Sequence, residues 1–173
     1  MTLVLATKNS KRARLFGFLL TAWFVIAIDQ FTKFWAIESL HPGVAKPLVG
    51  DLVRLVLVYN DSAAFSIGYG VTWIFAIVST LATLAILWFA PKLETVGWSV
   101  AGGLALGGVV GNLIDRLTRP PGFGQGQVVD FISIPLNFPI FNVADMAIVS
   151  VAVIVVLRIM SGTALGKSPS KNV

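Results

Sequence analysis

The chain has no cysteine, one histidine and only eight acidic residues among its 173 residues. The missing cysteine excludes a disulfide, a thiolate metal site and a thiol nucleophile. The single histidine, His41, lies in a loop beside Pro42 and Gly43, where we expect it to be solvated, so a Ser-His-Asp triad is not expected. Charged residues make up only 12% of the chain, and the mean hydropathy is +0.85. These values exclude an ordinary soluble domain.

Several apolar stretches are long enough to cross a bilayer. We therefore predict an all-α membrane protein with four transmembrane helices, at about residues 15–37, 71–90, 96–116 and 139–158. The first stretch is interrupted by Asp29 and Gln30 and has no small-residue cleavage site, so we interpret it as a retained helix and not as a secretory signal. The whole transmembrane domain covers residues 15–160, between a basic tail at 1–14 and a disordered polar tail at 161–173.

Lysine and arginine predict the orientation of these helices. With both termini on the cytoplasmic side, eight of the thirteen basic residues lie inside, four of them in the N-terminal tail. We therefore expect a multi-pass protein with both termini in the cytoplasm. The net charge of +5 is then explained by anionic lipid headgroups, and nucleic acid is not an expected partner.

Two longer segments, residues 38–70 and 117–138, lie on the outer side of this topology. Residues 52–59 are rich in β-branched side chains and predict a strand, with a turn at 60–62 and a partner strand at 63–67. Residues 127–132, which include Asp130, are also expected to be extended. The outer face should therefore carry a small β platform.

Asp145 is the only charged residue in the 27 residues from 131 to 157, where a carboxylate is costly unless it is paired or functional. Three other acids, Asp29, Asp115 and Asp130, also lie in apolar segments or at their edges. The first helix leaves the membrane near Asp29 and the third near Asp115. Asp145 lies roughly 10 Å along the fourth helix at 1.5 Å per residue. All four acids are therefore expected near the outer face.

Paired carboxylates are the chemistry that this composition leaves open. Two Asp side chains that share a site do not both ionise easily, so one keeps its proton while the other acts as a base. The ionised one activates water and the protonated one polarises a scissile carbonyl, which hydrolyses a peptide without a nucleophilic side chain or a metal. A Ser/Lys pair would need a dry lysine, and Lys33 is better explained as snorkelling to the interface. For Asp115, a salt bridge to the adjacent Arg116 is an equally good explanation.

Helical spacing favours a convergent site. Asn112, Asp115 and Arg116 stand at i, i+3 and i+4, which places them on one face of the third helix. Asn142 and Asp145 have the same relation on the fourth helix. The glycines of the third helix predict close helix packing. They are Gly102, Gly103, Gly107, Gly108 and Gly111.

In these residues the chain resembles the bacterial lipoprotein signal peptidase family, also called signal peptidase II. Five short motifs of that family occur in order over roughly residues 15–160. They are residues 29–33 (DQFTK), 60–66 (NDSAAFS), 111–116 (GNLIDR), 128–131 (VVDF) and 141–145 (FNVAD). One position departs from the pattern, because Ser62 stands where the family usually has glycine.

The resemblance implies an aspartic endopeptidase of the bacterial inner membrane that works without a cofactor. Such enzymes remove signal peptides from prolipoproteins by cutting before a cysteine that already carries diacylglycerol. The implied catalytic dyad is Asp130 and Asp145, while Asn112 and Arg116 resemble groups that line the substrate site and contact the inhibitor globomycin. The other matching positions, to which we assign supporting roles, are Asp29, Asn60, Asp115 and Asn142. The implied partners are diacylglyceryl-modified prolipoproteins and membrane lipid.

The main alternative is a small proton-coupled transporter that uses buried carboxylates as relay sites. Transporters usually place binding residues near the midplane on broken helices and often have internal repeats, whereas here the acids gather at one face. A membrane scaffold protein would explain the helices but would leave the acids without a purpose.

Overall fold

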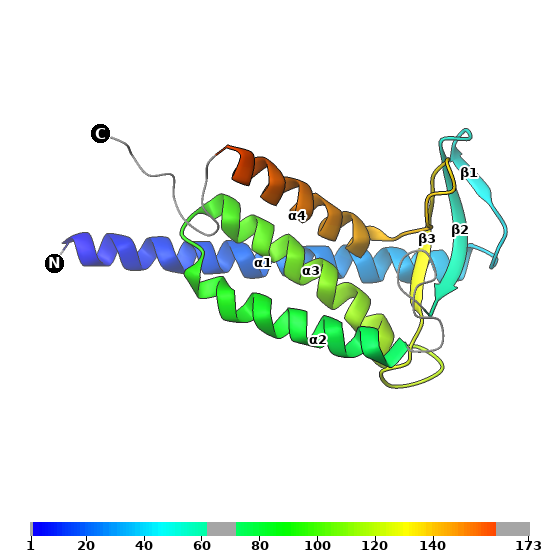
Figure 1. The fold of residues 1–173 in the computed structure, drawn as a ribbon, viewed down its shortest axis with the longest axis horizontal. Coiled ribbons are helices and arrows are strands. Elements are labelled where there is room, and N and C mark those ends of the chain that lie inside the picture. The colour runs from blue at the N-terminus through cyan, green and yellow to red at the C-terminus, as the bar shows by residue number, and fades with distance from the viewer. Residues whose placement is uncertain (1, 62–71, 162–173) are drawn as a thin grey trace.

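The computed structural model describes the backbone of residues 2–61 and 72–161, with side chains from residue 11 onward in these ranges. The helices and strands follow the chain as α1 (Thr2–Ser39), β1 (Lys46–Val49), β2 (Val53–Asn60), α2 (Thr72–Phe89), a short 3₁₀ helix η2 (Ala90–Lys92), α3 (Val96–Thr118), β3 (Val128–Ser133) and α4 (Val143–Met160). The long helices run side by side, and the sheet stands across one end of the bundle (Figure 1). The beginning of α1 and the end of α4 both lie at the opposite end.

The predicted fold class is confirmed. Within the described residues, four helices are long and apolar enough to cross a membrane. Their outward faces carry large exposed apolar side chains, such as Trp23 on α1 and Trp88 on α2, which suit contact with lipid. α3 is the central helix, because it packs against α1, α2 and α4. Half of the residues in its membrane-spanning stretch are buried inside the protein, against 11% of those in α2 and in α4.

Two of the predicted helix starts are wrong. α1 begins at Thr2 and not at residue 15, because no glycine or proline precedes Gly17 and nothing in the basic segment ends a helix. α4 begins at Val143 and not at residue 139. Here the side chain of Asn142 accepts a hydrogen bond from the backbone N–H of Asp145, and the Asp145 carboxylate accepts one from the backbone N–H of Asn142. This capping box fixes the start of the helix and places Asp145 in its first turn.

The sheet is antiparallel, with β2 between β1 and β3. The strand expected at 52–59 and the extended segment expected at 127–132 are confirmed as β2 and β3, and they pair so that Val58 lies opposite Asp130. β1 was not predicted. The partner strand expected at 63–67, the departure at Ser62 and the tail expected at 161–173 lie, apart from Ser161, outside the described residues.

A small apolar cluster fixes the sheet to the bundle. Leu57 on β2 and Val129 and Phe131 on β3 pack against Ala36 and Leu40 at the end of α1. All of these side chains are nearly or fully buried. Burial of this face sets the height of β3, and therefore of Asp130, above the helices.

Glycine allows α3 to approach its neighbours closely. A Cβ atom on Gly107 would lie 2.6 Å from the Cβ of Val25 on α1, and one on Gly108 would lie 2.6 Å from the carbonyl oxygen of Ala144 on α4. Real Cβ atoms do not approach other atoms so closely, so both positions require glycine for this packing. The expected packing role of these glycines is confirmed.

Candidate active site

Two acids that are 15 residues apart in the sequence share one site. Asp130 comes from β3, and Asp145 comes from the first turn of α4. After β3 the chain turns back, and Phe141 forms an antiparallel bridge with Ile132. This bridge places Asn142 next to the strand and starts α4 beside it. The fold therefore brings Asp145 to the strand that carries Asp130.

Each carboxylate oxygen of this pair accepts a hydrogen bond. Asp130 accepts from the side-chain amide of Asn60 at 2.8 Å and from that of Asn142 at 2.6 Å. Asp145 accepts from the side-chain amide of Asn112 at 2.8 Å and from the backbone N–H of Asn142 at 3.0 Å. Asn142 is fully buried and contacts both acids, so it holds them in a fixed relation.

Burial and like charge act together on Asp130. Its side chain is 3% exposed, and a buried carboxylate favours its protonated form. Burial, followed by repulsion from Asp145, raises the pKa of Asp130 to about 7, although the amides of Asn60 and Asn142 favour the ionised form. An acid of this kind still holds its proton close to neutral pH, as acid–base catalysis requires.

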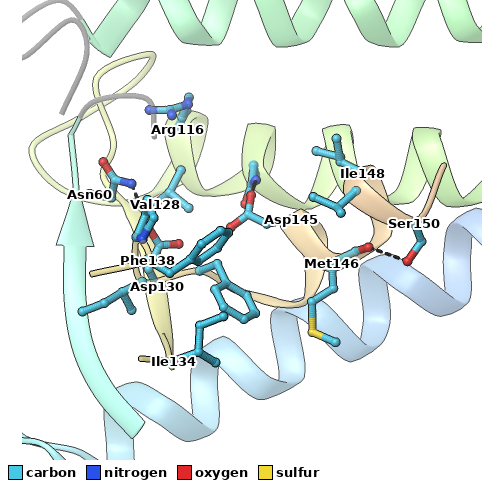
Figure 2. Close-up of a pocket in the computed structure, with 15 residues that line it drawn as sticks. Asn60, Arg116, Val128, Asp130, Ile134, Phe138, Asp145, Met146, Ile148 and Ser150 are labelled. Carbon is cyan, nitrogen blue, oxygen red and sulfur yellow. Dashed lines mark hydrogen bonds between the residues drawn. The ribbon is translucent and has the colours of Figure 1, made fainter. Parts of the chain in front are cut away.

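A cavity of about 640 Å³ opens beside the two acids (Figure 2). Its polar side is formed by Asp130, Asp145, Asn60, Asn112 and Arg116. Its other side is apolar and is lined by Ile134, Phe138, Pro139, Ile140, Phe141, Met146, Ile148 and Val149. Met146 is 50% exposed and Val149 is 60% exposed, so the cavity continues onto the outer face of α4. This shape suits a ligand with a polar reacting group and a long apolar part.

Arg116 is the cation of the cavity. Its guanidinium lies over the ring of Phe75, 5.1 Å from the ring centroid, and it is almost fully buried. Asp130 and Asp145 both attract its positive charge. The salt bridge to Arg116 that was the alternative explanation for Asp115 is not formed, because neighbouring residues on a helix point in different directions. Asp115 pairs with Lys33 and with Arg119, one turn further along α3.

A second charged cluster is buried behind the cavity. Lys33 pairs with Asp29 at 2.9 Å and with Asp115 at 2.8 Å, and all three side chains are fully buried. Gln30 donates to both acids. The expected snorkelling of Lys33 is therefore wrong, because two buried carboxylates hold its ammonium group inside the bundle. Asp29 also accepts a hydrogen bond from the backbone N–H of Ala144 at 2.9 Å, near the start of α4.

The structure thus divides the predicted site residues into two layers. The residues that line the cavity are Asn60, Asn112, Arg116, Asp130 and Asp145. Asn142 lies directly beneath them, and Asp29 and Asp115 belong to the buried cluster. The sequence interpretation missed the role of Lys33, although its position four residues after Asp29 on one helix face was a usable signal. In the described part of the chain, no group of three or more His, Asp or Glu side chains is placed to hold a metal ion.

Fold and site together define a class. This is a multi-pass membrane protein with paired carboxylates at one end of its helix bundle, beside a cavity that is apolar on its far side. The sequence profile described as signal peptidase (SPase) II matches residues 21–161. The chain belongs to the signal peptidase II family.

Individual relatives agree with this assignment. A lipoprotein signal peptidase of Leifsonia xyli is 47% identical over 72% of this chain, and one of Mycobacterium avium is 41% identical over 80% of it. The matched part spans 58% of the Leifsonia protein and 75% of the Mycobacterium protein. A solved bacterial membrane enzyme superposes with a TM-score of 0.76 at 27% identity, covering 88% of this chain and 93% of its own.

Proposed function

We propose that this protein is a membrane-embedded aspartic endopeptidase that removes signal peptides from prolipoproteins, cutting before the diacylglyceryl-modified cysteine. The observation that carries the proposal is the cavity, which has two carboxylates on one side and an apolar surface continuous with α4 on the other. A lipidated cysteine needs both surfaces, because its acyl chains stay in the leaflet while the peptide bond beside it meets the acids. The family and the names of the relatives support the same substrate class.

The reaction uses one proton shared by the two acids. The ionised acid takes a proton from a water molecule, and the resulting hydroxide attacks the carbonyl carbon of the scissile bond. The protonated acid donates its proton to the carbonyl oxygen. Collapse of the tetrahedral intermediate breaks the C–N bond as the acid that took the proton from water gives it to the nitrogen, and the other acid takes back a proton from a hydroxyl of the intermediate. Asn60, Asn112 and Asn142 fix the carboxylates through their amide groups, and Arg116 supplies positive charge at the cavity wall.

The proposal includes the place of the protein in the cell. We assign it to the bacterial inner membrane, with the sheet and the acids on the outer side and both termini in the cytoplasm. The arrangement of the helices supports this assignment, because the start of α1 and the end of α4 lie together at the end away from the sheet (Figure 1). Globomycin is the expected inhibitor, with Asn112 and Arg116 among its contacts.

The proposed activity predicts a dependence on the lipid of the substrate. The purified protein should cut a signal-peptide substrate before its diacylglyceryl-cysteine. It should cut the same peptide without lipid at least about tenfold less efficiently, because buried acyl chains contribute about 0.8 kcal/mol per CH₂ group. Mass spectrometry of the products gives the cut site, and initial rates give kcat/KM for both substrates. Equal efficiency on the two substrates, or cutting at another bond, would count against this assignment.

The raised pKa of Asp130 predicts an alkaline limit to activity. Since the pKa of Asp130 is about 7, the pair holds its shared proton below that pH and loses it above. Without the proton no acid remains for the carbonyl oxygen, so kcat/KM should fall about tenfold per pH unit above pH 7. Rates measured from pH 5 to 9, with thermal unfolding recorded at each pH, separate this effect from loss of fold. A flat profile up to pH 9 would show that no such proton is needed.

A further inference from the structure

The amide of Asn112 has only one possible orientation. Its Oδ1 atom lies 2.9 Å from the ammonium group of Lys33, and its Nδ2 atom lies 2.8 Å from a carboxylate oxygen of Asp145. An ammonium group can only donate hydrogen bonds, so the Asn112 atom facing Lys33 must be the oxygen. The nitrogen must then face Asp145. A charged residue outside the cavity thus helps to fix which end of this amide meets the acid.

We propose that Lys33 is a positioning residue for the acid pair, because its ammonium group fixes the amide of Asn112 and thereby the hydrogen bond that Asp145 accepts. The inference rests on the proposed function, since it assigns a task within that reaction. Lys33 does not line the cavity and is fully buried, so it acts through Asn112 and not on the substrate.

All three N–H donors of the Lys33 ammonium group are used, and each donates to a fixed acceptor. The partners are Asp29 at 2.9 Å, Asp115 at 2.8 Å and Asn112 at 2.9 Å. The two carboxylates hold the ammonium group from α1 and α3, so its third N–H has one direction left. Neutral side chains of similar length cannot reproduce three charge-assisted bonds from one atom.

The Asn112 amide is also linked to Asp130 through Asn142. Asn142 donates to Asn112 Oδ1 at 3.1 Å and to Asp130 at 2.6 Å from one amide nitrogen, while its own oxygen accepts from the backbone N–H of Asp145. If the Asn112 amide turned over, its nitrogen would face the Asn142 nitrogen and its oxygen would face a carboxylate oxygen. Both contacts would be unfavourable. Fixing Asn112 therefore keeps both acids in their hydrogen-bonded arrangement.

The charges around this network predict a change in the pH dependence of kcat/KM that a purely structural role of Lys33 would not produce. Lys33 faces Asp29 and Asp115, and Asp130 is influenced by Asp145 and Lys33, with Arg116 at the cavity wall. Lys33 favours the ionised form of Asp130. Loss of this cation should therefore move the alkaline limb of the kcat/KM profile to higher pH.

The test compares Lys33→Met with Arg119→Gln in the full chain, using the lipidated peptide substrate. Each change removes one cation from Asp115, but only Lys33 contacts Asn112. We expect Lys33→Met to lower kcat roughly 10- to 100-fold through misplacement of the acids, with KM little changed and the alkaline limb moved to higher pH. Arg119→Gln should stay within about threefold of wild type and keep its pH profile.

A second pair of variants covers the case in which Lys33→Met does not fold. In Lys33→Met/Asp115→Asn the remaining charges are Asp29 and Arg119, and in Arg119→Gln/Asp115→Asn they are Asp29 and Lys33. Both clusters are neutral, and only the first lacks the donor to Asn112. The first should be at least about tenfold slower than the second.

The outcomes separate the two proposals. Equal rates within either pair, with active wild type, would overturn the positioning role of Lys33 and leave the peptidase assignment intact. An unmoved alkaline limb in an otherwise slow Lys33→Met would reduce Lys33 to a structural residue and also overturn the inference. A folded wild type that cuts nothing would overturn the proposed function, and the inference with it.

Discussion

Asp130→Asn and Asp145→Asn are each expected to lower kcat/KM for the lipidated substrate by about 10⁴-fold. Asparagine keeps the size of the side chain but can neither take a proton from water nor give one to the carbonyl oxygen. Each variant leaves the other acid and its hydrogen bonds from Asn60 or Asn112 in place, so the fold should be retained. The measurement is the rate of product formation, followed by mass spectrometry, beside a thermal unfolding scan of each protein.

Asp51→Asn is the matched control for this experiment. Asp51 lies in the turn between β1 and β2, its side chain is 91% exposed, and it pairs only with Arg54 among the charged groups of the described residues. Such surface pairs contribute little, so this variant should cut at the wild-type rate. Full activity in Asp130→Asn or Asp145→Asn would remove that residue from the reaction and make Asp115 the next to test. If folded wild type also failed to cut, a proton-flux assay would test the transporter alternative.

Gly108→Ala is expected to lower kcat/KM roughly 100-fold and to destabilise the protein by about 1–3 kcal/mol. The new Cβ would lie 2.6 Å from the carbonyl oxygen of Ala144 and 2.8 Å from a side-chain carbon of Ile148. Backbone cannot give way as a flexible side chain can, so α4 must move away from α3. That movement lengthens the hydrogen bond between Asn112 on α3 and Asp145 on α4. Cleavage rates and thermal unfolding in the same detergent measure both effects.

Gly17→Ala provides the matched control, because it makes the same change in α1 where, apart from the adjoining residues and the backbone of the helix itself, no atom lies within 4 Å of the new Cβ. Alanine is also the better helix former, so this variant should be at least as stable as wild type. Wild-type activity and stability in Gly108→Ala would show that the spacing of α3 and α4 does not control the acid pair.

The membrane helices were predictable because their signal is local. A bilayer demands about 20 consecutive apolar residues, and any segment that meets this demand is visible without knowledge of its neighbours. The residues at which the helices begin were harder to predict from the sequence. The start of α4 depends on a capping box between Asn142 and Asp145 and on the bridge from Phe141 to β3, and the second of these is a tertiary contact.

The pairing of the strands was also not predictable from local sequence patterns. The β-branched run at β2 identifies a strand, but its partners do not follow from it. β3 lies some 70 residues later in the chain and pairs with β2 so that Val58 lies opposite Asp130. This register depends on the burial of both strands against the end of α1. Pairing between distant strands is decided by packing, and a pattern within one strand carries little information about it.

By itself, the sequence determined that this is a membrane protein with four helices, and it identified the acids that a membrane segment would not otherwise keep. These follow from the cost of charge and of unpaired backbone in lipid, which acts on each segment separately. Only the tertiary structure decided the rest. In the folded protein, Lys33 is buried between Asp29 and Asp115, and Asp115 does not pair with Arg116. Asn142 links Asp130 to Asp145 through hydrogen bonds to both. The reason is that hydrogen bonds between buried polar groups are chosen among all the partners that the fold brings within reach, and those partners come from four different elements of the chain.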